Sequence, residues 1–202
     1  MFKKLFITGI LLINAFFAKA QSPLFNSNTS EKDKEESIIY KNFHNQCDFI
    51  MAYSVSSYWR GNTAQYNLLA LKDGVWLKGY LHTQKRKNNT WRKPLVVFKE
   101  VDPDSASYIM KYLDSAGFYS LNRDSLNISE RRVNDDNIQR ITISDAINYK
   151  FEILSRNDFL VIESYAPEFF FEKMPEIKSR GAFIKLRDWF LLKYKVLPIQ
   201  QP

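Results

Sequence analysis

The chain has 202 residues, of which 45% are hydrophobic and 15% aromatic, enough to bury a substantial core in one domain. Its formal net charge is +7, but Lys3, Lys4 and Lys19 lie in a short N-terminal segment, beyond which 26 basic and 22 acidic residues remain. This small excess is not typical of nucleic-acid-binding domains, so we expect no nucleic acid partner. Cys47 is the only cysteine, which excludes an internal disulfide.

The first twenty residues have the three parts of a secretory signal peptide. Lys3 and Lys4 precede a mainly apolar run over residues 5–17, and Ala18-Lys19-Ala20 resembles a cleavage site. The alternative is a retained membrane anchor, but the run is shorter than the ~20 apolar residues that cross a bilayer. We predict that residues 1–20 are removed and that the mature chain, from Gln21, has no transmembrane segment. Its location is then periplasmic or secreted.

Residues 21–34 are polar and rich in Ser and Asn, which predicts a flexible lead-in to a single domain over residues 35–202. Ser30 is a candidate N-cap for a helix that ends near His44. The segment Phe49–Trp59 is rich in β-branched and aromatic residues and predicts a strand. Its apolar start predicts that Cys47 is buried.

The clearest local pattern is a hairpin around Asp73-Gly74, a residue pair favoured in two-residue turns. If Lys72 pairs with Val75, one face of the hairpin is almost entirely apolar, whereas a shift of one residue mixes the two faces. The opposite face combines aromatic, amide and charged side chains, which suit a sugar ring or a peptide. The candidate ligand-binding residues on it are Trp76, Tyr80, Lys78, Asn67 and His82. The alternative is that a helix covers this face, because Leu69 and Leu71 on it also need cover.

A basic loop follows the hairpin. Five positive side chains, Lys85, Arg86, Lys87, Arg92 and Lys93, surround Trp91 within nine residues. Outside the cytosol such a loop would attract an anionic glycan or lipid surface, and the attraction would be screened by salt. The alternative is an ordinary solvated connection between strands.

The remaining pattern predicts an α+β fold with antiparallel sheet. A helix begins at Asp102-Pro103 and ends at Gly117, residues 122–137 are irregular, and two helices close the chain, one opening at Pro167 and one capped by Ser179. On the strand 149–154, Lys150 and Glu152 predict a solvated face. The other predicted strands are 95–98, 138–144 and 159–165. Segments 47–121 and 138–194 each combine strands with a helix, so they are candidates for two diverged units packed as one domain.

Catalytic chemistry finds little support in the residue pattern. His44 and Cys47 are close in sequence, but a helix end beside a buried strand is the favoured explanation, and the two lack further partners for a zinc site. Glu168, Glu172 and Glu176 recur every four residues, but Pro175 interrupts the helix that would align them. We expect no cofactor and no metal.

The favoured hypothesis is an exported, non-enzymatic binding domain of the bacterial envelope or secreted space, with an envelope protein or an acidic glycan as partner. The alternative is an Asp/Glu-based hydrolase of envelope sugars or peptides.

Overall fold

The computed structural model of the chain describes residue 25 and residues 29–57, 61–134, 137–156 and 158–194. The predicted signal segment and the predicted new N-terminus at Gln21 lie outside these ranges. Among the described residues, no helix combines the length and the apolar character that crossing a membrane requires.

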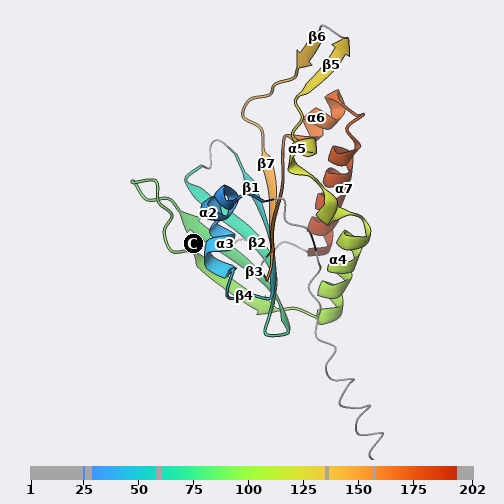
Figure 1. The fold of residues 1–202 in the computed structure, drawn as a ribbon. Helices are drawn as coiled ribbons and strands as arrows, with labels where there is room; N and C mark the ends of the chain where they lie inside the picture. The colour runs from blue at the N-terminus through green and yellow to red at the C-terminus, as the bar shows by residue number, and fades with distance from the viewer. Residues whose placement is uncertain (1–24, 26–28, 58–60, 135–136, 157, 195–202) are drawn as a thin grey trace, which may run out of the picture.

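A six-stranded antiparallel sheet forms the centre of the fold, in the spatial order β4-β3-β2-β1-β7-β8 (Figure 1). Together with the helices this confirms the predicted α+β class with antiparallel sheet. The strands are β1 (Phe49–Ser56), β2 (Thr63–Lys72), β3 (Val75–Gln84), β4 (Leu95–Glu100), β7 (Asn148–Ser155) and β8 (Asp158–Tyr165).

The β2–β3 hairpin has the predicted register, in which Lys72 pairs with Val75. Asp73 and Gly74 both have positive φ, 51° and 79°, as the turn types that match strand twist require. The turn therefore fixes which side chains share each face of the two strands.

β1 lies in the middle of the sheet and pairs with β2 on one side and β7 on the other. Segments 47–121 and 138–194, the two candidate units, thus contribute strands to one continuous sheet.

Helices cover both faces of the sheet. On one face lie α2 (Glu31–Glu36) and α3 (Ile38–Phe43); on the other lie α4 (Pro103–Ser115) and α7 (Lys178–Tyr194) (Figure 1). A single helix was expected from Ser30, and Ser30 does cap α2, but Ser37 ends it and caps α3. Asp102 caps α4 as predicted, whereas α7 begins at Lys178, so Ser179 is not its cap.

Burial on both faces corrects the interpretation of β7. Alternation of Lys150 and Glu152 predicts a solvated face, but Glu152 is fully buried because α3 packs over that side of the sheet. The other face of β7 packs against α7, whose predicted apolar stripe is buried throughout: Phe183, Leu186, Phe190 and Tyr194.

The segment between α4 and β7 was predicted least well. It contains the short helices η2 (Phe118–Ser120) and α5 (Arg123–Leu126), and a separate two-stranded ribbon of β5 (Glu130–Asn134) and β6 (Asn137–Arg140). The predicted strand 138–144 therefore ends early and does not join the main sheet. Figure 1 shows the ribbon extending from the body beside α6 (Pro167–Lys173).

Candidate functional site

The polar face of the hairpin continues onto β4. Tyr80 lies between Asn67 on β2 and Val97 on β4, and His82 lies between Gln65 and Leu95. Directly opposed residues of neighbouring strands point to the same face of a sheet. These residues form one contiguous group, here called the edge surface: Gln65, Asn67, Tyr80, His82, Leu95 and Val97.

The edge surface is apolar at its outer rim. Leu95 is 64% exposed and Val97 is 56% exposed, although both are strand residues of the kind normally buried. Both lie on the outermost strand, on the sheet face that α4 and α7 cover over the more central strands. Two adjacent exposed aliphatic side chains on an outer strand are a feature of binding surfaces.

Trp76 and Lys78, two of the predicted ligand-binding residues, make contacts within the fold instead. Trp76 is only 2% exposed and packs edge-on against Phe49 in the core under the helices. The Lys78 ammonium donates to the Tyr194 carbonyl at the end of α7 and lies 4.4 Å from the centre of the Tyr194 ring. The alternative interpretation therefore holds for this end of the hairpin, where a helix covers the face. The physical reason is the need to bury Leu69 and Leu71.

Tyr80, His82 and Asn67 remain half-exposed on the edge surface. Burial raises the pKa of the Tyr80 phenol, whose hydroxyl has no hydrogen-bond partner among the described residues. The Gln65 amide nitrogen lies 3.5 Å from His82 Nδ1. This part of the surface thus offers an aromatic ring beside amide and imidazole groups.

The backbone of β4 is paired on one side only. The Val101 amide donates to the Trp76 carbonyl at 3.0 Å, which fixes the alternation of hydrogen bonds along the β3–β4 ladder. By that alternation Leu95, Val97 and Lys99 bond to β3, whereas the N–H and C=O groups of Val96, Phe98 and Glu100 point away from the sheet. β4 is the terminal strand of the sheet order, so within the described part of the chain these groups face no further strand and form an open edge.

Gly79 holds β4 close to β3. An added Cβ at this position would lie 2.4 Å from Cδ1 of Phe98, the residue paired with Gly79. The Phe98 ring therefore occupies the space above the glycine and packs against Phe43 of α3. This packing anchors β4 on its inner face and leaves its outer edge open.

The basic loop of residues 85–93 joins β3 to β4 and projects beyond the sheet (Figure 1). Lys85 and Trp91 form a bridge at its base, with the Lys85 ammonium 5.1 Å from the Trp91 ring centre. The Arg86 amide donates to the Thr90 carbonyl at 2.7 Å and closes the tip. Four of the predicted charges are exposed on this structured turn: Arg86, Lys87, Arg92 and Lys93.

The opposite edge of the sheet differs from β4, because α5 closes part of it. The Asn127 side chain, just after α5, donates to the Glu163 carbonyl at 2.9 Å and accepts from the Tyr165 amide at 3.1 Å. The Ser164 hydroxyl donates to the Leu126 carbonyl. These contacts satisfy outward groups of β8.

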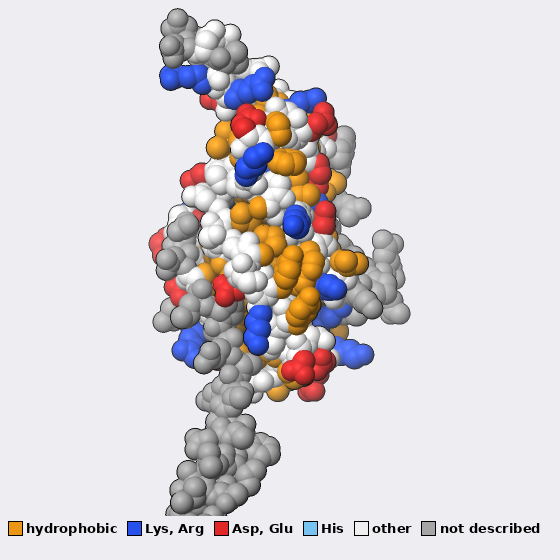
Figure 2. Space-filling view, turned by 90° about the vertical axis from the view of Figure 1, so that its right-hand side faces the viewer, with side chains coloured by type: hydrophobic (Ala, Val, Ile, Leu, Met, Phe, Trp, Pro, Cys, Tyr) orange, Lys and Arg blue, Asp and Glu red, His pale blue; other side chains and the backbone are white. Residues whose placement is uncertain are grey.

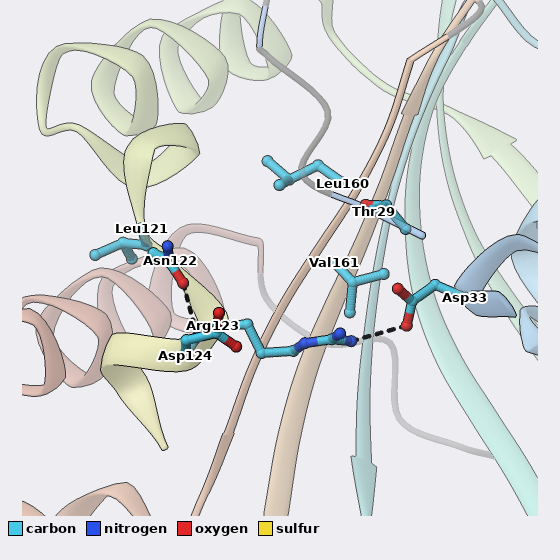
Figure 3. Close-up of a pocket in the computed structure, with 8 residues that line it drawn as sticks. All are labelled: Thr29, Asp33, Leu121, Asn122, Arg123, Asp124, Leu160 and Val161. Carbon is cyan, nitrogen blue, oxygen red and sulfur yellow. Dashed lines mark hydrogen bonds and ion pairs between the residues drawn. The ribbon is translucent and has the colours of Figure 1, made fainter. Parts of the chain in front are cut away.

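A small pocket of about 90 Å³ lies between α2, α5 and β8 (Figure 3). Within it Arg123 donates to Asp33 at 2.8 Å and lies 3.6 Å from Glu163. Burial acts to raise the pKa of Asp33, but hydrogen bonds from Arg123 and Ser30 lower it to about 2. A carboxyl group with this pKa is ionised at neutral pH and holds no proton for general acid catalysis. The pocket is also far smaller than the ~300 Å³ of a typical ligand site.

In the described residues the His44 ring contacts Tyr40 and Asn45 rather than the Cys47 thiol. The His44 ring stacks on Tyr40, and Nδ1 lies 2.9 Å from the Tyr40 carbonyl oxygen. Cys47 is half-buried rather than buried as predicted, and desolvation raises the pKa of its thiol, opposite to the shift of a nucleophilic cysteine. Within the described ranges, no three His, Cys, Asp or Glu side chains lie together as a metal site.

A second exposed apolar group lies on the outer side of the helices. Figure 2 shows hydrophobic side chains gathered on the side that carries α4 and α7, where Tyr108 and Leu192 are exposed. Tyr112 stacks on Trp189 at 3.8 Å between ring centres, and Tyr108 lies 5.9 Å from the same ring. These contacts join α4 to α7.

Sequence reasoning missed Leu95 and Val97 as candidate binding residues. It predicted their strand, but the position of that strand at the sheet edge depends on the order of all six strands. The available signal was Pro94 between Lys93 and the strand, because Pro and Lys are common at exposed strand edges.

Comparison of the chain with protein-family models, with curated proteins and with solved structures gives no match.

Proposed function

We propose that the protein is an exported, non-catalytic interaction module of the bacterial envelope or secreted space, which binds a partner through the edge surface and the basic loop. The observation that carries the proposal is the exposure of Leu95 and Val97 on an open strand beside this loop. Apolar side chains rimmed by charges are typical of protein contact sites. Export rests on the signal-like residues 1–20.

A partner protein is favoured over a glycan because of the two aliphatic side chains. Leu95 and Val97 gain free energy from losing contact with water, and a polysaccharide offers little apolar surface for this. The basic loop gives this surface a positive charge, which attracts acidic partners and speeds their association.

The test is capture of partners by the purified, tagged protein from envelope and medium fractions at low and high salt. Wild-type protein is compared with the Leu95→Lys/Val97→Lys double variant, which keeps the strand but removes the apolar rim. The matched control is Ile138→Lys, because Ile138 is equally exposed but lies on the β5–β6 ribbon.

We expect the wild type and the Ile138→Lys control to retain the same single protein, and the double variant to lose it. Recovery of only polyanionic material that high salt removes would assign binding to the basic loop alone. Equal capture by all three proteins would refute the proposed surface. Circular dichroism verifies that each variant is folded.

A further inference from the structure

Resting on the proposed function, we propose that β4 binds its partner by strand addition: an extended segment, acidic at one end and carrying alternate apolar side chains, pairs with the outer edge of β4. Such a segment would extend the six-stranded sheet by one strand. Its main-chain groups would bond to β4, and its side chains would contact the edge surface.

The outward backbone groups of β4 determine which of its residues would bond to an added strand. Val96, Phe98 and Glu100 each present one N–H donor and one C=O acceptor at the open edge, as the β3–β4 hydrogen-bond alternation requires. On the opposite edge, the Glu163 carbonyl accepts from Asn127 and the Tyr165 amide donates to Asn127, so β8 is partly bonded and β4 is the more open edge.

The exposed side chains of β4 determine that apolar residues occupy alternate positions of the partner segment. Leu95 and Val97 lie on one face of β4, two residues apart, the spacing at which successive same-face side chains of an added strand would meet them. β-Branched residues at alternate positions of the partner would cover these two side chains.

The positive charge at the start of β4 determines which end of the partner segment is acidic. Residues 85–100 contain six basic side chains and only one acidic side chain, Glu100. The exposed members of the loop, Arg86, Lys87, Arg92 and Lys93, adjoin the start of β4. A partner segment with carboxylates at that end would be attracted, and one with ammonium groups there would be repelled.

The test uses isotope-labelled protein and two synthetic peptides, in which three acidic residues precede or follow alternating valine and threonine, so that both strand directions are sampled. Backbone amide exchange is measured by NMR with and without each peptide. We expect new protection at Val96, Phe98 and Glu100, and no change at Leu95, Val97 and Lys99, whose amides already bond to β3. Protection without this alternation, or shifts confined to side chains, would overturn strand addition while leaving a binding surface.

Two variants at one position separate the backbone from the side chain. Glu100→Pro removes one outward N–H, which an exposed strand edge tolerates, and should weaken peptide binding about fivefold, the effect of one hydrogen bond of about 1 kcal/mol. Glu100→Val keeps the N–H and should bind as well as the wild type. Equal affinity of the two variants would contradict main-chain pairing.

Two further probes test the charge and the class of partner. A peptide with lysines in place of the acidic residues should bind at least tenfold more weakly in low salt, and equal binding would overturn the charge preference. An anionic polysaccharide that shifts residues 85–93 and leaves the alternating amides unprotected would support glycan binding instead. Failure of both acidic peptides to bind at millimolar concentration overturns strand addition, whereas the capture experiment tests the proposed function independently.

Discussion

Replacing Lys150 by Met should destabilise the protein by about 3 kcal/mol at pH 7, since loss of one partner leaves a buried charge uncompensated. The Glu152 side chain is fully buried, its Oε1 pairs with the Lys150 ammonium, and its Oε2 accepts from the Ser37 hydroxyl at 2.6 Å. Burial acts to lower the pKa of Lys150, but the charge of Glu152 raises it above the ordinary value. Met has similar length and removes only the ammonium group.

Urea unfolding followed by circular dichroism at pH 7 measures this loss of stability. The Lys150→Met/Glu152→Gln double variant is the control, because it removes both charges and retains an acceptor for Ser37; it should recover most of the lost stability. A loss of less than about 0.5 kcal/mol at pH 7 would show that Glu152 is not held by Lys150.

Three further substitutions test other contacts. Asp33→Asn should cost about 1 kcal/mol at pH 7, less than the full pKa shift implies because the pair with Arg123 is partly solvated. Because the pKa of Asp33 is depressed in the folded state, the difference from wild type should fade between pH 4 and pH 2; a constant difference in urea titrations would refute this. Gly79→Ala should cost about 2 kcal/mol, because the new methyl group must displace both the Phe98 ring and the Val97 carbonyl, and an unchanged melting temperature would contradict these contacts. Gly74→Val should cost about 1–2 kcal/mol at a φ of 79°, measured in the same way, and a neutral effect would contradict the turn geometry.

The local parts of the fold were predictable from the sequence because short-range chemistry determines them. Asp73-Gly74 gave both the turn and the register of β2 and β3, and Asp102-Pro103 gave the start of α4. In each case two adjacent residues satisfy a backbone requirement that does not depend on the rest of the chain.

The burial of polar residues was not predictable in the same way. Glu152 has the alternation of a solvated strand, and only the position of α3 over β7 places it inside. Trp76 and Tyr80 lie on the same face of β3, yet Trp76 is buried in the core under the helices and Tyr80 is half-exposed. The candidate surface was therefore identified in part, as Tyr80, His82, Asn67 and the basic loop, while Leu95 and Val97 required the sheet order.

The central position of β1 also has a consequence for how the chain folds. β1 to β4 are consecutive neighbours and form a meander from local contacts, whereas the partners across β1 and β7 are about a hundred residues apart in sequence. Closing so long a loop is slow, because its entropy is lost before the new contacts form. Docking of the β7–β8 hairpin onto the completed meander is thus the expected slow step of folding. Before that docking the meander would have two open edges, at β1 and at β4, and unpaired strand edges favour aggregation.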